Sequence, residues 1–447
     1  MYVTPRFSIA QKSSLLTLHH HLGRRRHQRY SFQTSQFGYS QGMWLLLLPP
    51  AIIVPILFLT IPQVLFPVAG KPILSHAIDS VVAVPTVKEI LLIGFYDDGV
   101  FKDFITETHK QYPGISIKYL REYKAMGTAG GLYHFRDVIL KGNPSKFFVI
   151  HADICCSFPL KEINDLFEEK DAKAVILGTK VSKEVAGNFG AIVRDSDQKV
   201  VHYVEKPESQ ISNLINAGVY LFDKSLFDVI ADARHARESS LKAAFHYDDD
   251  SEEVLSLEKD ILVRLPETGA FYVYETKDFW RQIKTAGSAV PANALYLQQA
   301  FQANPNGPGL AQPSATIVPP VYIDPTAHVD PTAKLGPNVS IGPGAKIGPG
   351  SRVKDSIILD DVEIKQNAII LHSIVSKGSK VGSWARVEGS PTTIDDHNST
   401  VIKDGAKVQT VTILASNVVV ADEIHVQNTV VLPHKEIKSD VKNEVIM

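Results

Sequence analysis

A six-residue period in the last third of the sequence constrains the fold more than any other feature. From residue 323 to 353 every sixth position is aliphatic, in hexapeptides such as LGPNVS, IGPGAK and IGPGSR. The aliphatic positions are Ile323, Val329, Leu335, Ile341, Ile347 and Val353. One aliphatic residue per turn, with Gly, Pro or small residues beside it, specifies a left-handed parallel β-helix. We expect this fold for residues 321–447.

The repeat is interrupted once. After Val353 the period loosens, and GSPTTIDDHNSTVIKDGAKV at 389–408 breaks it before coil-like sequence resumes at 411–432. Insertions in repeat proteins commonly lie on the binding face. We therefore predict that residues 389–408 project as a loop insertion and that its acids reach a partner subunit. These acids are Asp395, Asp396 and Asp404.

Upstream of the repeat, short apolar runs alternate with polar, helix-like stretches. The runs 89–95, 146–153 and 174–179 are EILLIGF, KFFVIHAD and AVILGT. Nearly continuous hydrophobicity over so few residues is typical of parallel strands that helices cover on both faces. The alternation predicts an α/β, Rossmann-like domain at 61–300, and the Pro, Gly and Asn residues of 301–320 predict a linker.

Residues 1–60 form an atypical N-terminal extension. They hold six of the 46 Lys and Arg residues and none of the 48 Asp and Glu residues, so the remainder carries a net charge of −8. An acidic body argues against a nucleic-acid surface. Residues 1–42 have the composition of a poorly ordered leader or transit peptide. The apolar segment 44–62 predicts a buried strand, with a membrane span as the alternative because of its length.

The cysteines bear on the compartment. Cys155 and Cys156 are adjacent, so an ordinary disulfide between them is not expected. This usage favours a reducing compartment. We expect a cytoplasmic protein, and the alternative is membrane anchoring or organelle targeting through residues 1–62.

Three motifs in the α/β region have residue types suited to chemistry, and each also has a structural explanation. MGTAGGL at 126–132 is a Gly-rich turn whose bare amides can approach a base or phosphate, or simply a flexible helix start. Asp153 ends a strand at the edge where open α/β sheets bind ligands, which suits Mg2+ on phosphates, or it caps the next turn. Glu205 and Lys206 follow another strand and place one charge of each sign at its end, which a surface ion pair would explain.

As an ordered set, the motifs resemble one family. They are LFPVAGKP, YLREYKAMGTAGGLYHFRD, FFVIHADI, HYVEKP, INAGVYLF, WRQIKTAGSA, WARVEG and VVLPHKE. The chain from about Leu65 to Met447 resembles the sugar-phosphate nucleotidylyltransferases with a hexapeptide-repeat β-helix, and most closely the alpha-type branch of mannose-1-phosphate guanylyltransferase (GDP-mannose pyrophosphorylase). The resemblance implies nucleotide binding at Gly127, Thr128 and Gly131. It implies sugar and sugar-phosphate binding at Glu205, Lys206, Asn216 and Gly218, and Mg2+ at Asp153.

Two departures from the catalytic members weaken the expected chemistry. The Gly-rich phosphate loop is missing, and Gln63 stands where those members have a lysine. Gln282 stands where they have the second metal-binding Asp, so we expect only weak Mg2+ binding. Nucleotidyl transfer depends on electrostatic stabilisation of the polyphosphate, so we assign no catalytic residue to this chain.

The resemblance therefore implies an alpha-type regulatory subunit. It would bind GDP-mannose and associate with itself and with a catalytic beta-type paralogue, and neither nucleic acid nor a membrane is an expected partner. The first alternative is an active enzyme that makes GDP-mannose and pyrophosphate from GTP and mannose-1-phosphate. A more remote alternative is an acyltransferase on the β-helix, with a histidine such as His372 as general base.

Overall fold

The computed structural model describes residues 43–48, 62–243, 254–391, 400–403 and 406–447. The expected leader at 1–42 lies outside this part of the chain. So do residues 49–61 and the acids Asp395, Asp396 and Asp404.

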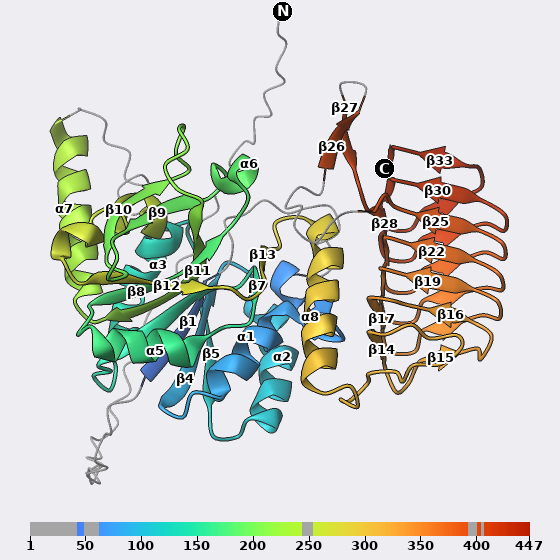
Figure 1. Ribbon diagram of the computed structural model, residues 1–447, viewed down its shortest axis with the longest axis horizontal. Coiled ribbons are helices and arrows are strands. Elements are labelled where there is room, and N and C mark those ends of the chain that lie inside the picture. The colour runs from blue at the N-terminus through green and yellow to red at the C-terminus, as the bar shows by residue number, and fades with distance from the viewer. Residues whose placement is uncertain (1–42, 49–61, 244–253, 392–399, 404–405) are drawn as a thin grey trace, which may run out of the picture. The chain divides into compact units, whose positions relative to one another are not determined.

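The α/β part is built on one nine-stranded sheet with the order β10-β9-β11-β6-β1-β4-β5, to which β8 and β12 are added beside β11 (Figure 1). β1, β4, β5 and β6 run parallel to one another. β11 pairs antiparallel with β6, β8 and β9, and β10 pairs antiparallel with β9. The strands are β1 (Met43–Leu48), β4 (Val87–Gly94), β5 (Ser116–Arg121), β6 (Lys146–His151), β8 (Ala174–Lys180), β9 (Gly190–Arg194), β10 (Val200–Glu205), β11 (Leu214–Asp223) and β12 (Phe271–Thr276).

The N-terminal apolar segment supplies a central strand of this sheet. β1 lies between β4 and β6, and Leu46 is in register with Leu91 on one side and Val149 on the other. The strand expected within 44–62 is therefore present in its first residues. It lies upstream of residue 61, where we expected the α/β domain to begin. No helix among the described residues is long and apolar enough to cross a membrane.

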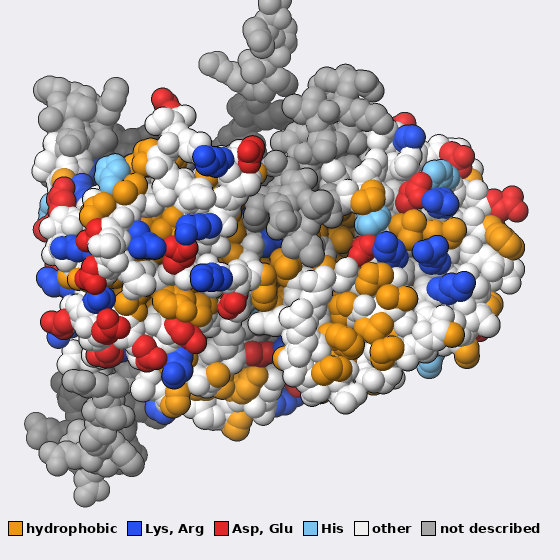
Figure 2. Space-filling model, in the orientation of Figure 1, with side chains coloured by type: hydrophobic (Ala, Val, Ile, Leu, Met, Phe, Trp, Pro, Cys, Tyr) orange, Lys and Arg blue, Asp and Glu red, His pale blue; other side chains and the backbone are white. Residues whose placement is uncertain are grey.

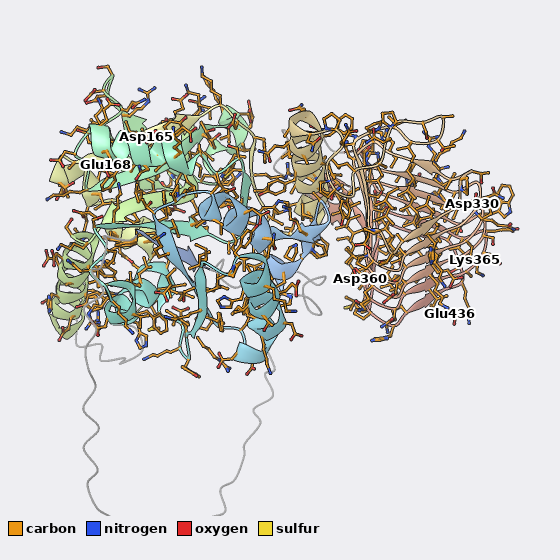
Figure 3. The ribbon with its side chains drawn as sticks, turned by 90° about the horizontal axis from the view of Figure 1, so that it is seen from below. Asp165, Glu168, Asp330, Asp360, Lys365 and Glu436 are labelled. Carbon is orange, nitrogen blue, oxygen red and sulfur yellow. The ribbon has the colours of Figure 1, made fainter. Side chains whose placement is uncertain are left out.

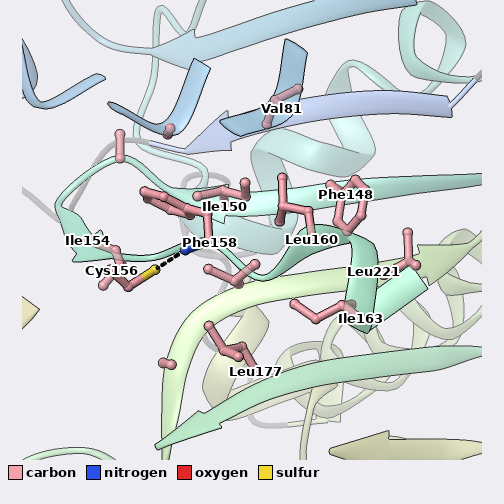
Figure 4. Close-up of a cluster of buried hydrophobic side chains, with 14 of the residues drawn as sticks. Val81, Phe148, Ile150, Ile154, Cys156, Phe158, Leu160, Ile163, Leu177 and Leu221 are labelled. Atoms are coloured by element: carbon pink, nitrogen blue, oxygen red, sulfur yellow. Dashed lines mark hydrogen bonds between the residues drawn. The ribbon is translucent and has the colours of Figure 1, made fainter. Parts of the chain in front are cut away.

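Helices cover both faces of the sheet, as the Rossmann-like prediction requires. Along β4, Ile90 and Leu92 join one buried cluster while Leu91 and Ile93 join the other, which is the alternation expected of a strand. Figure 4 shows part of the first cluster, including Phe148 and Ile163. The helices are α1 (Ile73–Val82), α2 (Asp98–Gln111) and α5 (Leu160–Glu169) on the first face, and α3 (Gly127–His134) and α7 (Leu226–Ala243) on the second.

The repeat folds into three parallel sheets of seven, six and six strands, so the β-helix prediction is confirmed. Each strand pairs with the strand one coil later, as when Lys346 pairs with His328, three hexapeptides earlier. Most of the periodic aliphatic residues are fully buried, and only Ile323 and Val329, at the start of the repeat, are partly exposed. The first strands are β14 (Val321–Ile323), β15 (His328–Val329), β16 (Lys334–Leu335) and β17 (Val339–Ile341), and the last is β34 (Val445–Ile446).

The insertion predicted at 389–408 contains a β-hairpin. β26 (Thr400–Lys403) and β27 (Ala406–Gln409) pair antiparallel, and Figure 1 shows them projecting from the stacked strands. The stack continues past the insertion, because β23 (Ser373–Val375) pairs directly with β28 (Thr412–Leu414). A regular solenoid therefore carries one protruding element.

A shared core joins the α/β part to the β-helix. Helix α8 (Ala289–Ala303) buries Val290 and Tyr296 in a cluster that also contains Ile357 and Ile374 of the β-helix. At its centre Asn293 is fully buried. Three hydrogen bonds satisfy it, and their partners are Ala69 N at 2.8 Å, Ser340 Oγ at 2.5 Å and Asn338 O at 3.2 Å.

Candidate functional site

The Gly-rich turn forms the start of α3, and another part of the chain occupies its first amides. The carbonyl of Leu255 accepts hydrogen bonds from Ala129 N at 3.0 Å and Gly130 N at 3.2 Å. Gly127 has a φ of +73°, and a Cβ there would lie 2.3 Å from that same carbonyl oxygen. The glycine is therefore required by a close approach of backbone. These two amides bind the protein itself, so they are not available to a base or a phosphate.

Thr128 and Gly131 face acidic side chains. Thr128 Oγ1 donates to Glu258 Oε2 at 3.1 Å and accepts from Leu257 N at 2.7 Å. A Cβ on Gly131 would lie 2.1 Å from Glu122 Oε1, so the missing side chain leaves room for that carboxylate. Glu122 is 6% exposed, and burial raises its pKa to about 7. Glu122 is not part of any motif predicted from the sequence, although its place directly after β5 parallels that of Asp153 after β6.

Asp153 is held in a buried pocket beside the end of β6. Only 1% of it is exposed, and burial raises its pKa. Gln282 Nε2 donates to Asp153 Oδ2 at 2.8 Å, while Oδ1 is buried without a hydrogen-bond partner in the described part of the chain. The two residues meet because β7 (Ile154–Cys156) pairs antiparallel with β13 (Trp280–Gln282), with Gln282 opposite Ile154.

These residues do not reproduce a two-carboxylate magnesium site. Mg2+ requires oxygen ligands in octahedral geometry. Gln282 instead turns its N–H group toward Asp153, and the opposite orientation of the amide would set its oxygen against a carboxylate oxygen. Within the described residues no group of three or more His, Cys, Asp or Glu side chains is arranged to hold a metal ion. Among the described residues, Asp153 Oδ1 is a buried carboxylate oxygen without a hydrogen-bond partner that could face a cation.

A hydrogen-bonded network lies on β10 and β11 where a sugar is expected. Asn216 Nδ2 donates to Tyr203 Oη at 3.1 Å and to Tyr220 Oη at 2.8 Å, and Tyr203 Oη donates to Glu205 Oε2 at 3.0 Å. Asn216 Oδ1 accepts from Gly218 N at 2.9 Å at an irregularity in the β11–β8 pairing. The structure therefore brings together three of the predicted sugar-site residues, which two unpredicted tyrosines orient.

Two lysines stand beside this network. Lys206 is exposed, its Nζ is 3.9 Å from Glu205 Oε1, and its backbone N donates to Phe189 O at 3.2 Å. Lys284 Nζ lies 5.1 Å from the centroid of the Phe189 ring. Lys284 reaches solvent, yet enough protein surrounds its ammonium to lower the pKa by desolvation. Asp153 and Glu205 oppose that shift, and the charge of Lys206 reinforces it. Lys284 is not among the site residues predicted from the sequence.

An ion pair connects the Gly-rich turn with the Asp153 strand. His151 Nε2 lies 3.2 Å from Glu258 Oε1, and both side chains are mostly buried. Burial works against the charged form of each residue, but their mutual attraction outweighs it. The pKa of Glu258 is about 2, and that of His151 is raised above its ordinary value. Glu258 also receives the hydroxyl of Thr128, so this pair fixes two of the predicted regions relative to each other.

Gln63, which we expect at the position of the family lysine, makes a contact with the protein backbone. It is buried at the start of a short 3-10 turn, Gln63–Leu65, and its Nε2 donates to the carbonyl of Ile283. The side chain thus supports the segment that carries Gln282 and Lys284. A neutral structural contact replaces the positive charge.

A hollow lies elsewhere, on an outer face of the β-helix. It encloses about 780 Å³ and is lined by Asp330 and Lys365, among others (Figure 3). His372, the general base of the acyltransferase alternative, does not line it and lies 3.7 Å from Asp355. On the face in Figure 2, acidic and basic side chains are intermingled over the α/β part.

The sheet, the strand-end carboxylates and the β-helix together define a nucleotidyltransferase-type protein. Residues 56–298 match the nucleotidyl transferase family, and residues 317–447 match the GMPPB C-terminal domain. The family resemblance seen in the sequence is thereby confirmed.

Individual relatives narrow the assignment. A protein of Schizosaccharomyces pombe named probable mannose-1-phosphate guanyltransferase is 48% identical, over 87% of this chain and 94% of its own length. Proteins of Dictyostelium discoideum and Xenopus tropicalis, each named mannose-1-phosphate guanylyltransferase regulatory subunit alpha, are 44% and 42% identical. These matches cover 88% and 87% of this chain and 94% of each relative. The chain belongs to the mannose-1-phosphate guanylyltransferase family.

Proposed function

We propose that this protein is a regulatory subunit that binds GDP-mannose without making it and that controls a catalytic paralogue. The observation that carries the proposal is the hydrogen bond from Gln282 to Asp153, at 2.8 Å. It fills the place where a catalytic member of the family needs two carboxylates around a metal. The names of the relatives from Dictyostelium discoideum and Xenopus tropicalis support the regulatory role.

The sugar half of the ligand is expected on β10 and β11. Asn216, Tyr203 and Glu205 form a connected set of donors and acceptors that is already oriented before a ligand binds. Preorganised polar groups of this kind lower the entropic cost of binding. Lys206, which is exposed beside Glu205, suits the phosphate that follows the sugar.

The base half is expected between Glu122 and the start of α3. Guanine presents adjacent N1–H and N2–H2 donors, and a carboxylate accepts such a pair of donors in a bidentate contact. Glu122 Oε1 lies directly over Gly131, where no side chain blocks it. This arrangement supports guanine as the base. Gly127 and Thr128 would shape the recess, but the amides of Ala129 and Gly130 would not contact the base, because they donate to Leu255.

The partners proposed for this subunit are a catalytic beta-type paralogue and further copies of itself. The β-helix and its hairpin provide a large surface that the nucleotide site does not use. The two free buried thiols, Cys155 and Cys156, are compatible with a reducing cytoplasm. Asp153 is the carboxylate that would bind Mg2+ at this site, and Gln282 in the second position would make that binding weak.

One experiment separates the regulatory proposal from the active-enzyme alternative. The purified full chain is incubated with GTP, Mg2+ and mannose-1-phosphate, and pyrophosphate release is followed. We expect no steady release, while calorimetry of the same protein detects binding of GDP-mannose. Continuous turnover by the chain alone would establish the active enzyme instead.

A further inference from the structure

The buried carboxylate of Asp153 lacks one of its expected partners. Its Oδ2 accepts the Gln282 amide, but its Oδ1 is buried and has no hydrogen-bond partner among the described residues. A buried, ionised carboxylate with an unsatisfied oxygen costs free energy. A positive charge near Oδ1 would remove that cost. In catalytic relatives a metal ion would supply this positive charge. Here the Gln282 amide occupies the position of the second metal-binding carboxylate.

Lys284 follows Gln282 by two residues, and its charge and that of Asp153 act on each other. Ile283 N donates to the backbone carbonyl of Asp153 at 2.8 Å, which fixes the backbone immediately before Lys284 against the pocket. Lys284 forms no ion pair within 4 Å in the described structure. Its recorded contact is with the ring of Phe189, at 5.1 Å from the centroid. Its ammonium is therefore free to meet an anion.

Phe189 brings the two lysines to the same side of the site. Its ring lies under the Lys284 ammonium, and its carbonyl accepts the backbone N–H of Lys206. Trp280 holds the ring in an edge-on contact, with centroids 5.3 Å apart. Two exposed ammonium groups beside a deep carboxylate form an arrangement that favours a ligand with two adjacent negative charges.

We infer that the site binds the diphosphate of its nucleotide sugar without a metal ion, and that Lys284 takes the electrostatic place of the metal. Lys284 would lie between Asp153 and one phosphate, while Lys206 meets the phosphate next to the sugar. The inference rests on the proposed binding of GDP-mannose and adds how its charge is neutralised. It also accounts for the occurrence of Gln282 and Lys284 in one short segment.

The test is calorimetric titration of the full chain with GDP-mannose, once with excess EDTA and once with Mg2+. We expect dissociation constants that agree within about twofold, because no step of binding takes up a metal. Lys284→Met should weaken binding about tenfold in both buffers, as expected for a lost charge-assisted contact. Lys88→Met is the matched control: Lys88 is an exposed lysine near the opposite end of β4, and its loss should leave affinity unchanged.

A second variant tests the same inference from the opposite direction. Gln282→Asp provides two carboxylates, so its binding should weaken in EDTA and recover when Mg2+ is added. Thermal unfolding of each variant shows whether it is folded. Loss of wild-type binding in EDTA would overturn the metal-free inference and leave the proposed function standing. An absence of GDP-mannose binding in both buffers would overturn both.

Discussion

Gly131 and Glu122 constrain each other, because the space that a side chain would need at position 131 is taken by the Glu122 carboxylate. The ordinary pKa of a glutamate is 4.5, and in the folded protein burial raises that of Glu122 to about 7. Protonation therefore favours the folded state, and ionisation opposes it. The folded state loses stability as the pH rises from about 4.5 through about 7.

Replacing Glu122 with Gln removes this titration. We expect Glu122→Gln to raise the melting temperature at pH 8 by about 2–4 °C and to change it little at pH 5. The same variant should bind GDP-mannose more weakly, because an amide accepts from one side only. Thermal unfolding at the two pH values measures the first effect. An equal shift at both would contradict the assigned pKa.

The His151–Glu258 pair has its own pH window. Glu258 has a pKa of about 2 instead of 4.5, so its contribution is complete above 4.5 and is lost as the pH falls toward 2. The pKa of His151 is raised above 6.5, so its contribution is complete below 6.5 and is lost as the pH rises through the folded value. The pair therefore stabilises the fold most between about pH 4.5 and 6.5.

Glu258→Gln should lower the free energy of unfolding by about 3 kcal/mol at pH 6, because it leaves a buried histidine charge without its partner. The loss should be smaller at pH 8.5 than at pH 6, because the charged fraction of the histidine falls as the pH rises. Urea unfolding at the two pH values measures both numbers. A pH-independent loss would show that packing, and not charge, makes the contribution.

The site residues that could be predicted from the sequence are those that directly follow a recognisable apolar strand. Asp153 and Glu205 follow apolar runs, so their place at a sheet edge could be inferred. Lys284 and Glu258 could not be found in this way, because their partners lie far away along the chain and come together only through tertiary pairing. The strands β7 and β13, which align Gln282 with Asp153, have three residues each and carry no detectable pattern.

At the scale of elements, α8 is the support on which the α/β part and the β-helix meet. Asn293→Ala would leave the Ala69 N–H and the Ser340 hydroxyl without their shared acceptor. We expect a loss of about 1–3 kcal/mol in the free energy of unfolding, the usual cost of buried unsatisfied polar groups. Gln298→Ala, which removes a weaker contact of 3.3 Å from the same helix to Asn338, should cost much less. Similar losses for both would contradict the central role of Asn293.

The hairpin of β26 and β27 is the element we assign to the catalytic partner. Removing the insertion at 389–408 should leave the β-helix folded, because β23 pairs with β28 without it. Regulation of the paralogue should be impaired. Circular dichroism and melting temperature check the fold, and inhibition of the paralogue by GDP-mannose checks the function. Unchanged inhibition would remove the hairpin from the interface.

Elements differ in how clearly the sequence announces them. The β-helix is predicted in register because its buried position recurs every six residues, from Leu335 onward without exception through Val353. The hairpin was expected only as a loop, since nothing in an irregular insertion distinguishes pairing from its absence. The hydrogen bonds between the Leu255 carbonyl and the start of α3 could not be predicted, because a backbone carbonyl has no sequence signature.

For the whole molecule, the shared core around α8 implies that the α/β part and the β-helix unfold together. Tryptophan fluorescence reports mainly on the α/β part, because Trp280 there is buried whereas Trp384 of the β-helix is 62% exposed and changes its environment less on unfolding. Far-UV circular dichroism reports on all the strands. We expect the two signals to give coincident urea transitions in the wild-type protein. Separate midpoints would show that the two parts are independent. In Asn293→Ala the transitions should begin to separate.

The sequence predicted the order and the class of the two large parts, but not where the first begins. The apolar segment ending at residue 62 carries no feature that distinguishes an internal strand from an anchor. Only the pairing of its first residues, 44–48, between β4 and β6 does so for that part. The length and hydrophobicity of a segment can be calculated from its own sequence, but whether it joins a sheet depends on the strands that lie beside it.

The Leu255 carbonyl has a consequence for how this receptor can diversify. Since it already engages two amides of α3, the base recognition that we propose would depend on replaceable groups such as the Glu122 carboxylate. Backbone contacts persist through most substitutions, but a specificity that depends on side chains can be changed by a single substitution. A lineage carrying this architecture could therefore retune which nucleotide it senses while leaving its scaffold intact.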